Sequence, residues 1–407
     1  MRAVKIPEKN VRVSLKEHSK HRYWTVIIPV ALIFNFLRPL PPAKVVIYPI
    51  SNQANGKIAN LKWPNESSQA ALGAEGFGLL ETHGEQSPIA TASIAKVITA
   101  LCVLQKHPLK IGEAGPLITI SEVDYDFYQN QVVNGGSLAP VYIGQKIDEY
   151  SALQALMLPS ANNMADTLAV WAFGNMESYH KFAKQYVASL GMNQTVIESD
   201  ASGYDPGTKS TAADLVRLGL AAAKNPVLME IASQKTFYWP GAGVLNNYNR
   251  LLGENGIDGL KTGNNSENLG GLLFTQQIKA ENQSLRVIGV VMGAPNLSTA
   301  LNESSELAAT TQPKFVSYMT AKTPAGYAQT KWGSRAILAE QPIGKIVYYQ
   351  NQPLSRQSQT KSTTSTNRDE QIGTFTYKSG NQEKVTKIIV KEPATAPSFW
   401  WRLMRIR

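Results

Sequence analysis

The chain has 407 residues, of which 43% are hydrophobic and 17% are charged. This composition excludes a disordered chain, and the length leaves room for two or three domains of ordinary size. Most of the net charge of +10 comes from the ends: residues 1–22 hold seven basic and two acidic side chains, and the last ten residues hold three arginines. Because the body between them is nearly neutral, no nucleic-acid partner is predicted. The basic ends instead favour an anionic membrane surface as their binding partner.

The N-terminal region joins a basic segment to a hydrophobic run, the pattern of an export signal. The run extends from Tyr23 to Leu37 and is closed by Arg38. It has about 15 residues where a spanning helix needs about 20, but flanking residues can supply the missing length. We predict a cytoplasmic segment at 1–22, a signal anchor crossing the membrane at 23–40, and an extracytoplasmic chain beyond it. Export after cleavage as a signal peptide is the alternative, although no small-x-small cleavage site follows.

The next part of the chain changes from a linker to regular structure. Residues 41–68 mix Pro, Asn and Ser with short apolar pieces and predict a stalk. The apolar, Gly-containing run at 70–81 predicts a strand or hairpin. A helix begins near Ala92 and ends near Pro108, since its apolar residues recur at helical spacing. It contains Cys102, the only cysteine, which is predicted to be buried and can form no internal disulfide.

The middle of the chain is predominantly helical. An apolar helical pattern covers Ser151–Phe173 and is interrupted at Pro159 and Ser160. The segment Thr211–Asp214 has the pattern of a capping box and opens a helix that continues to Lys224.

Strand patterns dominate after residue 235. Short β-rich runs occupy Leu260–Thr262, Gly270–Thr275 and Arg286–Met292, separated by polar turns. One early strand, a helical middle and several late strands predict an α+β domain over residues 69–312, whose sheet draws strands from both ends of the domain.

The C-terminal region predicts a separate module. Residues 325–395 form a small β-rich unit with β segments at Ala336–Gln350 and Ile372–Val390. The Ser/Thr/Gln-rich stretch 355–367 between them predicts a long mobile loop. Residues 396–407 mix aromatics with arginines, which is typical of a short segment at a membrane interface. The alternative is a tail that packs against its own β module.

Three short motifs carry the candidate chemistry. Ser93 and Lys96 form a Ser-x-x-Lys pair, which a helix places on one face about one turn apart. A serine hydroxyl needs a neighbouring base, and a lysine can serve when burial or another cation disfavours its charge. Alone, each motif has a structural reading: Ser160–Asn162 as a polar helix cap, and Lys261–Gly263 as a strand that ends in a turn.

Their order and surroundings resemble the penicillin-recognising serine enzymes. Ile89–Ala100 and Gly256–Gly263 are similar to the first and third motifs of low-molecular-mass D-alanyl-D-alanine carboxypeptidases, peptidase family S11. Asp200–Gly203 and Ser210–Leu215 match further blocks of that family. The resemblance implies a transpeptidase/β-lactamase-like α+β fold, with an antiparallel sheet flanked by helices and a helical subdomain. Residues 69–312 would then be the catalytic carboxypeptidase domain.

The resemblance implies four catalytic residues. Ser93 attacks the carbonyl of the penultimate D-alanine, and neutral Lys96 takes its proton. Ser160 passes a proton to the leaving D-alanine nitrogen. Asn162 holds the substrate amide and orients Lys96. The family often has Ser-Gly-Asn where this chain has Ser160-Ala161-Asn162, a small change.

It also implies four substrate-binding residues on the third motif. Lys261 attracts the terminal carboxylate and depresses the pKa of Lys96. Thr262 shares the carboxylate, and Gly263 lets the strand backbone approach the substrate. The backbone amide of Asn264, with that of Ser93, forms the oxyanion hole. The residues after Gly263 depart from the family pattern, which leaves substrate preference at the rim of the cleft open.

The implied partners are peptidoglycan stem peptides and β-lactam inhibitors, without cofactor or metal. The five histidines show no ligand spacing, which argues against a zinc carboxypeptidase. Three alternatives share part of the pattern: a DD-endopeptidase of cross-links, a β-lactamase and a non-catalytic wall scaffold. A β-lactamase needs a glutamate that activates water, and Glu198 lacks the Glu-x-x-Leu-Asn context.

Overall fold

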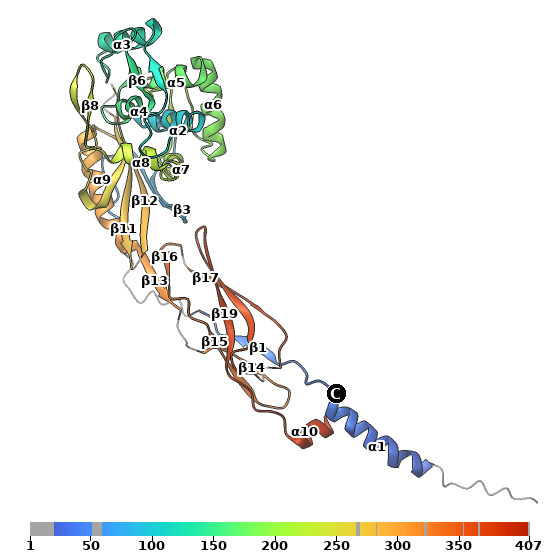
Figure 1. Ribbon diagram of the computed structural model, residues 1–407. Helices are drawn as coiled ribbons and strands as arrows, with labels where there is room; N and C mark the ends of the chain where they lie inside the picture. The colour runs from blue at the N-terminus through green and yellow to red at the C-terminus, as the bar shows by residue number, and fades with distance from the viewer. Residues whose placement is uncertain are drawn as a thin grey trace, which may run out of the picture.

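The computed structural model describes residues 20–50, 59–265, 269–281, 283–320, 324–352, 354–364 and 367–405. The molecule is elongated (Figure 1). A body of helices around a sheet lies at one end and a β module in the middle. Helices α1 (Lys20–Leu37) and α10 (Phe399–Met404) lie together at the other end.

The sheet of the first body has five antiparallel strands in the order β10-β11-β12-β2-β3. Their bounds are Ile257–Asn264, Gly270–Ala280, Gln283–Ala294, Gln69–Ala74 and Gly78–Gly84. Side chains alternate along β12, so Ile288 and Val290 pack in one core and Val287 and Val291 in another. Helix α7 (Ala212–Ala222) packs with the first core and α9 (Leu297–Thr311) with the second. The sheet is thus buried on both faces, as the predicted α+β arrangement requires.

The helical subdomain covers the α7 side of the sheet. Its elements are η1 (Ala92–Ala95), α2 (Lys96–Lys106), α3 (Glu122–Asn134), α4 (Glu149–Met157), α5 (Asn162–Phe173), α6 (Met176–Ser189) and α8 (Pro226–Ser233). The predicted break near Pro159 is confirmed, because it separates α4 from α5. The helix expected from Ala92 instead starts with a 3-10 turn and becomes α-helical at Lys96. Cys102 is completely buried, as predicted.

Short two-stranded ribbons complete this body and join it to the module. They pair β4 (Ile89–Ala90) with β7 (Lys209–Ser210), β5 (Leu117–Thr119) with β6 (Lys146–Asp148), β8 (Thr236–Trp239) with β9 (Gly243–Asn246), and β13 (Phe315–Met319) with β16 (Lys345–Tyr349). Single 3-10 turns, η2 (Glu254–Gly256) and η3 (Gln312–Lys314), precede β10 and β13. At the joint, the Glu81 carboxylate accepts from the Tyr349 hydroxyl at 2.6 Å and pairs with Lys314 at 3.0 Å.

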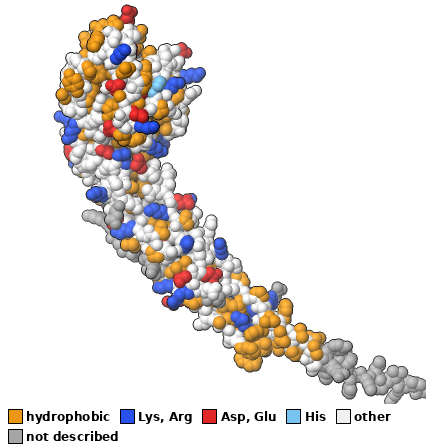
Figure 2. Space-filling model, viewed as in Figure 1, with side chains coloured by type: hydrophobic (Ala, Val, Ile, Leu, Met, Phe, Trp, Pro, Cys, Tyr) orange, Lys and Arg blue, Asp and Glu red, His pale blue; other side chains and the backbone are white. Residues whose placement is uncertain are grey.

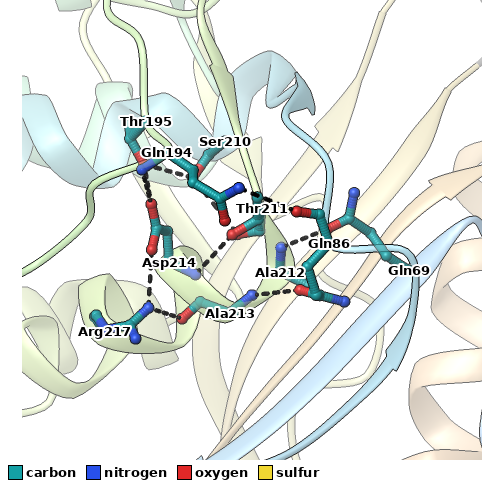
Figure 3. A network of polar contacts seen from close by, with 10 residues as sticks. All are labelled: Gln69, Gln86, Gln194, Thr195, Ser210, Thr211, Ala212, Ala213, Asp214 and Arg217. Atoms are coloured by element: carbon teal, nitrogen blue, oxygen red, sulfur yellow. Dashed lines mark hydrogen bonds and ion pairs between the residues drawn. The ribbon is translucent and has the colours of Figure 1, made fainter.

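The start of α7 is fixed by side chains from outside the helix (Figure 3). The first amides of a helix lack partners within it and need other acceptors. Here the amides of residues 212–214 donate to side-chain oxygens of Gln69, Gln86 and Thr211, at 2.7, 3.0 and 3.1 Å. The predicted N-cap at Thr211 is confirmed, whereas the Asp214 carboxylate, expected to complete a capping box, instead accepts from the Gln194 amide and pairs with Arg217. Because Gln69 lies on β2, these bonds tie α7 to the sheet that it covers.

The C-terminal module is built on a six-stranded sheet in the order β1-β14-β15-β19-β18-β17. Its strands are Lys44–Ile47, Pro324–Gln329, Arg335–Glu340, Gln382–Glu392, Gln371–Ser379 and Ser355–Thr360. Its core is a cluster that includes Leu338, Phe375, Ile388 and Val390.

Two segments differ from the sequence expectation here. Within 41–68, expected to be a stalk, residues 44–47 form β1, which pairs antiparallel with β14 and places Val46 opposite Tyr327. Within 355–367, expected to be a mobile loop, residues 355–360 form β17 against β18. Both are short strands at the edges of the sheet. One side of each backbone lacks a paired strand, so neither segment needs the long apolar pattern of a central strand.

The first and last helices of the described chain, α1 and α10, pack against each other. The ring of Phe36 in α1 lies 5.4 Å from that of Phe399 in α10. The Arg405 guanidinium donates to the carbonyl of Asn35 at 2.9 Å, so a distant side chain caps the C-terminus of α1. Trp401 also lies 5.4 Å from Trp332 of the β module, which is the docked arrangement considered as the alternative for the tail.

Helix α1 lies mostly within the region 23–40, where a membrane-crossing anchor was expected. Across the described residues, no helix is both long and apolar enough to cross a membrane. The basic segment 1–22 lies almost entirely outside the described residues.

Candidate active site

A cleft of about 490 Å³ lies where the helical subdomain meets the edge of the sheet at β10. It brings together residues from all three motifs, although Ser93, Ser160 and Thr262 are far apart in sequence. Its lining also includes Asn134, Gly135, Gly136, Ser137, Asn162, Gly203, Tyr204, Tyr248, Asn264, Asn265 and Leu297.

Ser93 lies in the 3-10 turn η1, and Lys96 is the first residue of α2. Lys96 Nζ is 2.8 Å from Ser93 Oγ, which is the contact a base needs to take the hydroxyl proton. Lys96 is completely buried whereas Ser93 lines the cleft. The residue before Ser93, Ala92, has φ of +45°, a conformation that side-chain-bearing residues rarely adopt and that is typical of functional sites.

Two further contacts fix the Lys96 amine. Lys96 Nζ donates to Asn162 Oδ1 at 2.7 Å and to the Ser202 carbonyl at 3.0 Å. Asn162 begins α5, so the second motif reaches the first directly. Gly203, next to Ser202, has φ of +72°, and a Cβ there would lie 2.2 Å from the carbonyl oxygen of Ala92. Only glycine allows this loop to approach the turn that carries Ser93.

Ser160 lies in the break between α4 and α5. Its φ is +63°, so the backbone is held in the left-handed region. Its hydroxyl is buried and has no hydrogen-bond partner in the described part of the chain. A buried hydroxyl without a partner beside a cleft is available to a bound molecule.

The third motif lies on the edge strand β10, beside η1. Lys261 is buried, and its amine donates to the carbonyl of Thr262 at 3.2 Å. Thr262 and Asn264 line the cleft. A Cβ on Gly263 would lie 2.9 Å from the Thr91 carbonyl oxygen. The glycine is therefore required by close packing of β10 on the turn that carries Ser93, which is a different reason from the approach to substrate that was expected.

Burial sets the protonation of both lysines. It lowers the pKa of Lys96 to about 7, against the opposing charges of Asp200 and Asp166. Burial, and then the charge of Lys96, hold the pKa of Lys261 well below its ordinary value. Lys261, expected to depress the pKa of Lys96, is not among the causes of that shift; the charge of Lys96 instead lowers the pKa of Lys261. Burial also raises the pKa of Asp166 to about 7.

Several residues of the site have no motif of their own. Gln131 accepts a hydrogen bond from Asn162, and Tyr204 and Tyr248 line the cleft. Ser202 lies in the block Asp200–Gly203. That block supported the family resemblance, but no role in the site was predicted for its residues. No local signal marks Gln131 or Tyr248, because both reach the cleft only through the tertiary fold. Among the described residues, no group of three or more His, Cys, Asp or Glu side chains is placed to hold a metal ion.

Comparison with known proteins gives one family match. The family model described as D-alanyl-D-alanine carboxypeptidase, peptidase S11, matches residues 76–296, more than half of the chain. The chain is 27% identical over 238 residues to D-alanyl-D-alanine carboxypeptidase DacC of Escherichia coli K12, covering 58% of each chain. It is 29% identical over 219 residues to DacD of Salmonella typhimurium LT2, covering 52% of this chain and 53% of the relative. The chain thus matches only a little over half the length of these curated relatives.

Solved structures support the fold. Penicillin binding protein 5 of Haemophilus influenzae matches with a TM-score of 0.58 and 18% identity, covering 81% of this chain and 98% of that chain. Penicillin binding protein 6B of Escherichia coli matches with a TM-score of 0.59 and 20% identity, covering 86% and 100%. The predicted fold class, including a β module after the α+β domain, is confirmed.

Proposed function

Because this chain belongs to the D-alanyl-D-alanine carboxypeptidase family, peptidase S11, we propose that it removes the terminal D-alanine from peptidoglycan stem peptides outside the cytoplasm. The observation that carries the proposal is the chain of contacts from Ser93 Oγ to Lys96 Nζ to Asn162 Oδ1 at the base of the cleft, at 2.8 and 2.7 Å. A hydroxyl beside a buried amine whose pKa is about 7 is an activated nucleophile at neutral pH.

In the proposed reaction, Ser93 Oγ attacks the carbonyl carbon of the penultimate D-alanine while its proton passes to Lys96 Nζ. The amides of Ser93 and Asn264 stabilise the negative charge on the carbonyl oxygen. The C–N bond then breaks, and the proton reaches the leaving nitrogen through the Ser160 hydroxyl. Water hydrolyses the ester on Ser93 and returns the enzyme to its starting state. A β-lactam acylates the same hydroxyl when its ring C–N bond opens.

The substrate carboxylate completes the activation of the base. Two buried amines close enough to influence each other disfavour simultaneous charge. A carboxylate bound beside Lys261 and Thr262 raises the pKa of Lys261 by attraction. The proton held there then disfavours charge on Lys96, which stays neutral and able to accept the proton of Ser93. A substrate with a free C-terminal carboxylate is therefore favoured.

Release of D-alanine tests the proposal. The purified chain should release D-alanine from a stem pentapeptide, release should stop after penicillin treatment, and a Ser93→Ala variant should neither react nor take a fluorescent penicillin label. Lack of D-alanine release and of label in the unaltered chain contradicts the proposal. A cross-linked dimer as parallel substrate separates carboxypeptidase from endopeptidase action, and fast turnover of a chromogenic β-lactam would instead indicate a β-lactamase.

We also propose that α1 and α10 attach the protein to the membrane. Figure 2 shows hydrophobic side chains gathered over this end of the molecule. Large apolar side chains exposed there are Trp24, Val26, Ile27, Ile28, Val30, Ile33, Phe34, Leu37, Phe399, Trp400 and Met404. A hollow of about 610 Å³ beside them is lined by Arg38, Lys331, Arg405 and Trp401. An apolar surface beside cationic side chains matches an anionic lipid surface.

Vesicle flotation tests this attachment with the full chain. Binding should be stronger to vesicles with phosphatidylglycerol than to pure phosphatidylcholine, and Trp400→Glu should weaken it. The matched control is Tyr238→Glu, which alters an equally exposed aromatic, 71% against 69% exposed, in the catalytic body. Equal binding of both variants and the unaltered chain would contradict the proposal.

A further inference from the structure

The side-chain amide of Asn162 is held at both ends. Its Oδ1 accepts from Lys96 Nζ at 2.7 Å, and its Nδ2 donates to Gln131 Oε1 at 2.8 Å. An asparagine amide has one accepting and one donating end, so the partner on one end decides what the other end presents. Gln131 can be such a partner because its Oε1 only accepts. It lies in the last turn of α3 and is 8% exposed.

The chain after α3 encloses this contact. Gly135 ends the helix in the left-handed conformation, with φ of +64°. A Cβ on the next residue, Gly136, would lie 2.1 Å from Gln131 Oε1 and 2.9 Å from Asn162 Nδ2. The backbone amide of Asn162 donates to the carbonyl of Ser137 at 2.8 Å. The segment 131–137 therefore surrounds the asparagine, and a side chain at residue 136 would displace the two side-chain ends that form the Gln131–Asn162 bond.

We propose that Gln131 is a positioning residue for the acylation step, an inference that rests on the proposed function. It holds the Asn162 amide with its oxygen toward Lys96, and it occupies one of the two Nδ2 hydrogens. The second hydrogen is left to bind the carbonyl of the acyl donor in the cleft, which Asn162 lines. Without Gln131, the amide can rotate and present its NH2 group to the amine. The base then loses an acceptor, and the substrate loses a donor.

The test measures acylation by a fluorescent penicillin across pH. Gln131→Met keeps the length of the side chain but removes the acceptor, and should lower the second-order acylation rate roughly ten- to a hundredfold, since a buried donor loses its partner. The acceptor Oδ1 favours the charged amine, so its loss lowers the pKa of Lys96. The rising part of the pH–rate profile on the acid side, here called the acid limb, should therefore move to lower pH in the Met variant. Gln131→Glu restores an acceptor and should recover most of the rate at its optimum.

A control in the same helix separates positioning from folding. Asp124, seven residues earlier and about two turns away, caps α3 by accepting from the Ser121 amide at 2.9 Å. Asp124→Asn should lower the melting temperature and leave the pH midpoint of acylation unchanged. The inference is overturned if Gln131→Met acylates at the unaltered rate, if its rate falls with no shift of the acid limb, or if Asp124→Asn produces the same shift. If the unaltered chain takes no label at all, the proposed function fails instead.

Discussion

The buried position of Lys96 predicts how acylation depends on pH. The amine must be neutral to accept the proton of Ser93, and burial lowers the pKa of Lys96 from 10.5 to about 7. At pH 7 about half of the molecules then carry a neutral base, against roughly one in three thousand for an ordinary lysine. The acylation rate should be about one tenth of its plateau at pH 6 and about nine tenths at pH 8.

A neighbouring carboxylate tests whether charge near Lys96 changes the pKa of its amine in the expected direction. The charge of Asp166 raises the pKa of Lys96, so Asp166→Asn should lower that pKa and move the rising limb to lower pH. The replacement keeps an oxygen for the Ala201 amide, which donates to Asp166 at 3.0 Å. The shift can therefore be read without loss of this bond.

The assay is the rate of labelling by a fluorescent penicillin at limiting concentration, measured from pH 5 to pH 9. Melting temperatures recorded at each pH exclude unfolding as the cause of any loss. A limb with its midpoint near 10, or a rate that does not change between pH 6 and pH 8, would refute the role of Lys96 as the base. A shift of the Asp166→Asn limb to higher pH would refute the electrostatic reasoning.

Three further predictions concern packing and stability. Gly263→Ala should slow labelling at least tenfold, because its Cβ would lie 2.9 Å from the Thr91 carbonyl oxygen; an unchanged rate would show that β10 can move freely. Burial without a partner in the described chain raises the pKa of Glu149 from 4.5 to about 7. The contribution of Glu149 to stability is therefore fully present below pH 4.5 and is lost as pH rises through 7. Glu149→Gln should remove this fall and add roughly 1–2 kcal/mol at pH 8 in denaturant titrations; a variant with the same pH dependence would assign the fall elsewhere. Gly326→Ala would place a Cβ 2.2 Å from the Val46 carbonyl oxygen and should release β1, seen as faster hydrogen exchange at 44–47; unchanged exchange would contradict this.

Local sequence was sufficient to predict much of the α+β body. The helical spacing after Ala92, the break at Pro159 and the cap at Thr211 all depend on interactions within a few residues. The three motifs were recognisable for a related reason. Attack on an acyl carbon requires a particular set of functional groups, and Ser93 and Lys96 are brought within reach of each other by one helical turn.

Patterns within a short segment could not predict the edge strands or the contacts between α1 and the C-terminal segment. The strand 44–47 pairs with residues almost three hundred positions later, and nothing in its four residues specifies that partner. The same holds for Arg405, whose guanidinium reaches the carbonyl of Asn35. Such contacts depend on how complete elements pack, and pattern within a segment carries no information about them.

The amino-acid sequence by itself determined the family and the α+β class, and it supplied the proposed reacting groups, because these follow from residue types at short spacings. Only the tertiary structure decided the state of those groups. The pKa of Lys96 comes from its complete burial, and the orientation of Asn162 comes from Gln131 on another helix. Desolvation and hydrogen-bond geometry are properties of residues gathered from distant parts of the chain, so they exist only once the chain has folded.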